Sequence, residues 1–211
     1  MPKPVAQFID ESLAYWESKK LNCLPGKIPE EMRTGETQDD WSFWHALAST
    51  VSEDDITDME RVLHVRLSPQ YKELLQHKHF MEVQIGEVSI FAHPIGTWKA
   101  SITDAVFGGY PKELLIEKSY LPFANYSDWG LLCFHITEQN ADGEYPVYRW
   151  DHESSEEFEY FAPDLRSVLE RETTTKAYAA ANGGGPSRLQ AAGFVAAVAE
   201  LTSEVIRQGL F

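Results

Sequence analysis

Two histidines separated by one residue could share a metal ion. His77 and His79 would point to different faces of a helix but to the same face of a strand. They follow the expected end of a helix, where a histidine also suits the negative end of the helix dipole. The chain lacks the two-histidine-plus-glutamate spacing of a zinc hydrolase. The pattern favours the helix-end interpretation, and we predict no metal site.

A dense acidic run offers a second kind of chemistry. It comprises Asp151, Glu153, Glu156, Glu157 and Glu159, directly after an expected strand. A carboxylate pair can serve as general acid and base only where burial separates the two pKa values. Adjacent glutamates in such a polar stretch favour a solvated face first and a partner-binding rim second, with catalysis third. The run also lacks the spacing and turn glycine of a calcium-binding EF-hand loop.

Aromatic residues near turns could line a recognition groove. Trp98, Tyr126 and Trp129 have this setting, although filling the core is the favoured interpretation. The candidate partner-binding residues are Asp151, Glu153, Glu156, Glu157, Trp129 and Tyr126.

No nucleophile or phosphate-binding signature accompanies these residues. Cys133 lies in an apolar strand and is interpreted as an inert core thiol, without a nucleophile elbow elsewhere. The glycines at 183–185 lack the lysine-serine or lysine-threonine pair of a phosphate-binding loop. We therefore predict no catalytic residue and no cofactor.

Composition narrows the class of partner. The 211 residues include 33 Asp and Glu against 18 Lys and Arg, a formal charge of −15. A protein that binds the phosphate backbone of nucleic acid needs positive charge, which this chain lacks. A basic protein is instead the expected partner of so acidic a chain. Cys23 and Cys133 are expected to be reduced. We expect a cytoplasmic protein, because Asp10 and Glu11 interrupt the first apolar stretch and no window approaches a membrane span.

The N-terminal part divides into a helix and a connector. Apolar residues at helical spacing predict an amphipathic helix over about 5–19. Prolines and glycines among polar residues predict a loop over 24–40. The apolar cluster of 41–47 suggests a short helix, and we place the start of the organised domain near Trp41.

The central part alternates helices with a meander of strands. Ser52 and Ser68–Pro69 have the composition of helix starts, and 165–171 is a third expected helix. Period-two patterns predict a hairpin over 81–91 and strands over 121–124, 131–136 and 145–150, with loops and one short helix between 94 and 117.

These elements predict an α+β fold: a mixed, largely antiparallel sheet flanked by helices, with extra N- and C-terminal helices. The expected regions are 1–40, the N-terminal helix and connector; 41–172, the α+β domain; and 173–211, a Gly-rich linker and a helix packing on the domain. A monomer or weak homodimer is expected.

Three motifs in order resemble a known family. The first is Ile56–Leu75, ITDMERVLHVRLSPQYKELL. The second joins Leu121–Ala124, LPFA, to Trp129–Phe134, WGLLCF. The third and closest is Pro146–Glu153, PVYRWDHE. Together they resemble the SUKH superfamily, which includes Smi/Knr-type regulators of fungal cell-wall synthesis and many bacterial immunity proteins.

The resemblance covers about 49–170 and implies an α+β domain that binds protein, with no conserved catalytic chemistry. In bacterial members the implied role is to neutralise a toxin, often a nuclease. A strongly acidic partner would suit a basic nuclease. Two alternatives stay open: a regulatory scaffold like the fungal members, and a hydrolase using buried carboxylate and histidine.

Overall fold

A computed structural model describes residues 2–38, 41–128, 130–151 and 157–181 of the chain. The chain falls into two units, 1–173 and 174–211, and the account below concerns the first. The C-terminal helix expected from the sequence lies outside the described residues, as does the Gly-rich linker at 183–185. No helix of the described part is long and apolar enough to cross a membrane.

A six-stranded sheet forms the centre of this unit, with the strand order β11-β10-β9-β8-β7-β6 and antiparallel pairing throughout. Its strands are β6 (Val83–Ile85), β7 (Val88–Ile90), β8 (Tyr120–Tyr126), β9 (Gly130–His135), β10 (Val147–Asp151) and β11 (Phe158–Ala162). The expected hairpin and the three later strands are confirmed. Strand β11 was not predicted.

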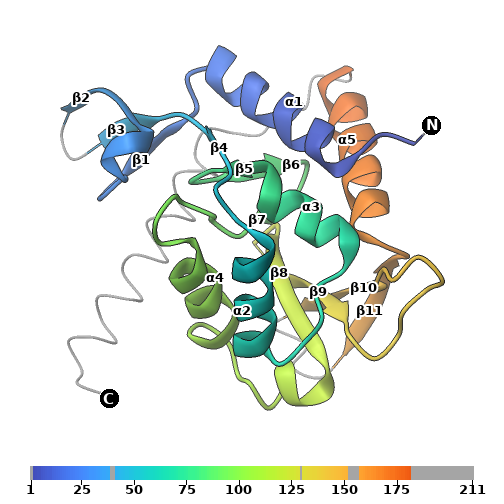
Figure 1. The fold of residues 1–211 in the computed structure, drawn as a ribbon. Helices are drawn as coiled ribbons and strands as arrows, with labels where there is room; N and C mark the ends of the chain where they lie inside the picture. Colours follow the sequence, from blue (N-terminus) through green and yellow to red (C-terminus); the bar gives the residue numbers. More distant parts are fainter. Residues whose placement is uncertain (1, 39–40, 129, 152–156, 182–211) are drawn as a thin grey trace. The chain divides into compact units, whose positions relative to one another are not determined.

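Within the described ranges, five α-helices accompany the sheet, and the α+β prediction is confirmed (Figure 1). They are α1 (Val5–Ser18), α2 (Glu53–Leu63), α3 (Pro69–His77), α4 (Trp98–Phe107) and α5 (Leu165–Ala181), with the short 3-10 turns η1 (Glu30–Met32) and η2 (Ile116–Lys118). Helix α5 runs beyond its expected end near Arg171.

Local sequence sets the helix starts. Ser52 and Asp55 form a reciprocal capping box at the first turn of α2. The Ser68 hydroxyl accepts from the backbone N–H of Tyr71, and Pro69 occupies the first turn of α3. Both predicted starts are confirmed.

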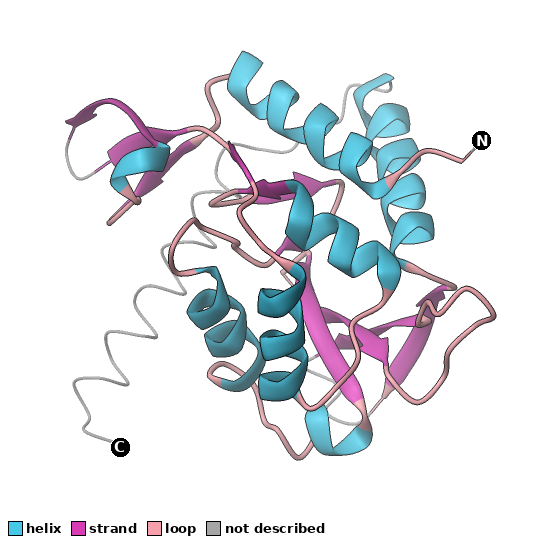
Figure 2. Cartoon of the chain, in the orientation of Figure 1, coloured by secondary structure: helices cyan, strands magenta, loops and turns pink. Residues whose placement is uncertain are grey.

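The segment between α1 and α2 departs from expectation. This segment contains a three-stranded sheet, ordered β1-β3-β2, and a short strand β4 that pairs with β5, which follows α3 (Figure 2). The strands are β1 (Cys23–Pro25), β2 (Arg33–Gln38), β3 (Trp41–Trp44), β4 (Leu47–Ala48) and β5 (Lys78–His79). The predicted loop over 24–40 and helix over 41–47 were therefore wrong. In β3, exposed Trp41 and Phe43 alternate with buried Ser42 and Trp44, which is the period of a strand.

One large apolar core joins the N-terminal segment to the rest. Val5, Phe8 and Ile9 of α1 are buried in the same cluster as Met32 and Trp44. That cluster also contains the inward residues of α2, α3, α4 and the first turns of α5. A smaller cluster lies on the second face of the sheet, around Cys133 and Trp150. Residues 5–9 are thus packed into the same core as the central sheet.

Candidate partner-binding site

Several strand ends lie together at one end of the six-stranded sheet. Tyr126 of β8 and Asp151 of β10 both pair with Gly130 of β9, so the end of β8, the start of β9 and the end of β10 lie at the same end. The β6–β7 turn joins them, because the backbone N–H of Ser127 donates to the carbonyl of Glu87 at 2.8 Å. We call this region the turn end.

Carboxylates gather at the turn end. Glu87, Asp128 and Glu157 are exposed there, and Asp151 is half-buried. Among the described residues that connect β6 to β7, β8 to β9 and β10 to β11, none is basic. The turn end therefore presents an acidic surface.

Tyr126 links this acidic surface to the core. Its ring meets Phe161 edge-on, with centroids 5.1 Å apart, and lies 5.8 Å from the guanidinium carbon of Arg149. Burial raises the pKa of the Tyr126 hydroxyl, and the nearby Glu172 carboxylate raises it further. A side chain on Gly130 would overlap the backbone carbonyl of Trp150 in the neighbouring strand, so only glycine fits between Tyr126 and Asp151.

The structure thus brings together three of the residues predicted from sequence: Tyr126, Asp151 and Glu157. Trp129, Glu153 and Glu156 lie outside the described residues. Trp98 is buried with only 6% of its surface exposed, so the core interpretation of this residue is confirmed.

Sequence analysis missed an aromatic surface on the second face of the sheet. We call it the aromatic strip, and it consists of Tyr120, His135, Tyr148, Phe158 and Tyr160. The signal was the alternation of Tyr148 with Trp150 and of Phe158 with Tyr160, which places each pair on one face. The expected strands did not include β11, because it follows so closely on the acidic run.

The strip continues from the smaller apolar cluster. Tyr120 and Phe158 pack against that cluster, which contains the fully buried Cys133. Burial raises the pKa of the Cys133 thiol, so the predicted inert core cysteine fits its surroundings.

The two histidines considered for a metal site have separate roles. His77 ends α3, and its Nε2 lies 2.8 Å from a carboxylate oxygen of Asp10 in α1. His79 is fully buried and stacks on His93 with ring centroids 4.7 Å apart. Within the described residues, no group of three or more His, Cys, Asp or Glu side chains is placed to hold a metal ion.

Hydrogen bonds fix the tautomers of the buried histidines, and burial favours their neutral form. The backbone N–H of Thr50 donates to His79 Nε2 at 3.1 Å, so His79 Nδ1 carries the proton and donates to the His93 carbonyl. His93 Nδ1 donates to the Lys78 carbonyl at 2.9 Å. Burial lowers the pKa of His93 to about 4. The two rings are therefore part of the packed core.

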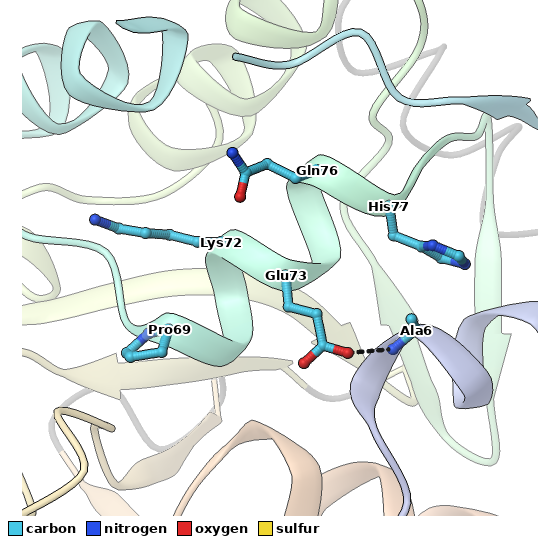
Figure 3. Close-up of a pocket in the computed structure, with 6 residues that line it drawn as sticks. All are labelled: Ala6, Pro69, Lys72, Glu73, Gln76 and His77. Carbon is cyan, nitrogen blue, oxygen red and sulfur yellow. Dashed lines mark hydrogen bonds between the residues drawn. The ribbon is translucent and has the colours of Figure 1, made fainter. Parts of the chain in front are cut away.

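A groove runs between α1 and α3 (Figure 3). It is lined by Ala6, Pro69, Lys72, Glu73, Gln76 and His77. Glu73 points across the groove and accepts from the backbone N–H of Ala6 at 3.0 Å, as Figure 3 shows. Lys72 pairs with Glu60 at 2.6 Å, and Gln76 donates to Glu53 at 2.7 Å. These polar groups hold α1 and α2 against α3.

Comparison with known proteins adds a family. Residues 50–171 match the model of the SMI1 / KNR4 family (SUKH-1). The matched stretch includes both the turn end and the aromatic strip. It excludes α1 and the three-stranded sheet. No curated protein matched the sequence.

Proposed function

The chain belongs to the SMI1/KNR4 family (SUKH-1), and from this premise we propose that it is a non-catalytic protein-binding domain that acts as an immunity protein. Its proposed partner is a basic toxin, in the first instance a nuclease. The proposal places the protein in the cytoplasm, where such a toxin would meet nucleic acid.

The observation that carries the proposal is the acidic turn end. Glu87, Asp128, Asp151 and Glu157 lie at or next to strand ends at the same end of the sheet, and Tyr126 is anchored beside them. A nuclease must be positively charged where it holds the phosphate backbone. An acidic surface on a protein of net charge −15 would meet that region with fast, salt-sensitive association.

Side-chain chemistry supports a binding role for this end. Backbone pairing with β9 positions Tyr126 and Asp151 on either side of Gly130, so their backbone needs little ordering when a partner binds. Tyrosine is also among the residues that contribute most to protein interfaces. We propose Tyr126, Asp151 and Glu157 as the centre of the contact, with Trp129, Glu153 and Glu156 beside them in the sequence.

The test begins with capture of the full chain's partner from its native lysate at low and high salt. The captured protein is then purified, and its association rate is measured against wild type and the Asp151→Lys/Glu157→Lys variant. The matched control is Glu30→Lys/Glu31→Lys, which makes the same charge change at two exposed glutamates of η1. An assay of the partner's own activity, with and without the chain, completes the test.

We expect one stoichiometric basic partner whose activity is blocked, with association slowed by salt and by the turn-end variant more than by the control. Equal rates for both variants would remove the turn end from the interface. Several substoichiometric housekeeping partners would instead favour the regulatory scaffold. Catalysis by the chain alone would favour the hydrolase.

A further inference from the structure

The second face of the sheet carries its own recognition chemistry. We propose that the aromatic strip is a docking surface for arginine side chains of a partner protein. The proposal rests on the proposed function for the basic character of that partner. It concerns a different surface, on the opposite face of the sheet from the Tyr126 ring.

Packing builds the strip from four strands. Tyr120 lies between His135 and Phe158, with ring centroids 4.7 Å and 3.6 Å away and nearly parallel planes. Tyr148 meets Tyr120 edge-on at 5.6 Å, and Tyr160 meets Tyr148 edge-on at 5.7 Å. Because each ring is held by its neighbours, the strip is ordered before any partner arrives.

The described residues cover only part of this face. Tyr110 packs edge-on against Trp150 at 5.9 Å, and Phe91 and Leu115 complete the buried cluster there. Beyond that cluster, Tyr120, Tyr148 and Phe158 are half-buried and Tyr160 is 56% exposed. Within the described residues, the hydroxyls of Tyr148 and Tyr160 make no hydrogen bond. They are available to a partner.

Charge selects the kind of partner. The Glu138 carboxylate lies 3.2 Å from His135 Nδ1 and is 59% exposed. Burial raises the pKa of Tyr148, and Glu138 raises it further, which places this carboxylate within electrostatic reach of the strip. A cation held over the rings would gain from both the aromatic faces and this carboxylate. A phosphate group would be repelled.

Ring geometry favours a guanidinium group over other ligands. Tyr148 lies at 72° to Tyr120 and at 86° to Tyr160, so these rings offer single faces next to ring edges and hydroxyls and no broad flat platform. A guanidinium group is small and planar, stacks on a single ring, and donates hydrogen bonds in its own plane. It can therefore lie on one tyrosine face while donating to a neighbouring hydroxyl or to Glu138.

The experiment titrates the full chain with a labelled nine-residue peptide of alternating arginine and serine, followed by fluorescence anisotropy at low salt. Matched peptides carry lysine or neutral citrulline instead of arginine. The protein variants are Tyr148→Leu and Tyr160→Leu, which keep apolar bulk but remove the ring. Tyr15→Leu, at a 40% exposed tyrosine of α1, is the control.

We expect the arginine peptide to bind more tightly than the lysine peptide, and the citrulline peptide to bind least. Loss of either ring should weaken arginine binding about two- to fivefold, and the Tyr15 variant should bind like wild type. Wild-type binding by both strip variants, or equal binding of arginine and citrulline peptides, would overturn the proposal. Asp151→Lys/Glu157→Lys measured against the purified partner reports separately on the proposed function.

Discussion

The carboxylate of Glu172 accepts a hydrogen bond from the backbone N–H of Glu87 at 3.0 Å. Glu172 is 2% exposed and belongs to α5, whereas Glu87 follows Gly86 in the β6–β7 turn. Helix α5 follows β11, which is one edge of the sheet. The bond therefore ties α5 to the β6–β7 turn at the opposite edge. The turn end of the sheet is braced by a helix.

Replacing Gly86 tests how closely the turn and the helix approach. Gly86 has φ +61°, and a Cβ there would lie 2.9 Å from the Glu172 backbone carbonyl. Gly96→Ala is the control, because Gly96 has φ +74° but no atom near its missing Cβ. We expect about 1–2 kcal/mol of strain from the positive φ in both variants, and about 1–3 kcal/mol more in Gly86→Ala. Urea unfolding measures both, and equal losses would contradict the close approach.

Glu82 should make stability fall as pH rises. Burial raises its pKa to about 7 from an ordinary 4.5, so the folded state holds the proton more tightly than the unfolded state. Stability from this group is therefore present below about pH 4.5 and lost as pH rises through 7, by at most about 3 kcal/mol. Glu82→Gln should gain stability relative to wild type across that window. If the unfolding free energies of wild type and Glu82→Gln changed by the same amount between pH 4.5 and pH 7.5, the prediction would be refuted.

His93 should act in the opposite direction. Its folded pKa of about 4 lies below the ordinary 6.5, so the unfolded state takes up the proton first as pH falls. Stability is then lost between about pH 6.5 and 4, again by at most about 3 kcal/mol. His93→Asn, which keeps a donor for the Lys78 carbonyl, should be less stable overall yet lose less on acidification. The slope of the unfolding free energy against pH tests this prediction, because packing lost at the smaller Asn side chain would lower stability at every pH.

Glu73 should stabilise the first turn of α1 from a different helix. Pro4 at the N-cap offers no side-chain acceptor, and the Glu73 carboxylate takes that place at the N–H of Ala6. Glu73→Ala should lose about 1 kcal/mol, which corresponds to roughly fivefold faster hydrogen exchange at Ala6. Glu73→Gln keeps an acceptor and should lose less. Unchanged exchange in Glu73→Ala would show that the cap contributes nothing.

Elements with local signals could be predicted from the sequence. The starts of α2 and α3 depend on Ser52 and Ser68, whose hydroxyls bond to backbone within three residues. The β6–β7 hairpin depends on alternation around a turn glycine, Gly86. In each case the residues that decide the structure are neighbours in the chain.

Elements fixed by distant contacts were missed or wrongly predicted. Strand β3 is only four residues long, too short for alternation to outweigh its dense apolar composition, and Trp44 is buried by the packing of the N-terminal segment. Acidic neighbours hide the strand pattern of β11 in the sequence, although Glu159 pairs with Arg149, which lies opposite it in β10. Likewise, Tyr126 and Asp151 lie at the same end of the sheet because both pair with Gly130, a register that composition does not reveal.

The position of α1 bears on self-association. Strand β6 is an edge of the six-stranded sheet, and edges with unpaired backbone groups recruit strands from other molecules. The Ser12 hydroxyl of α1 donates to the Gln84 carbonyl in β6 at 2.7 Å, and α1 packs beside this strand. A fragment cut at the start of the matched family region, residue 50, would leave that edge uncovered and prone to edge-to-edge aggregation. Helix α1, which lies outside the family match, thus protects the β6 edge of the sheet from pairing with other molecules.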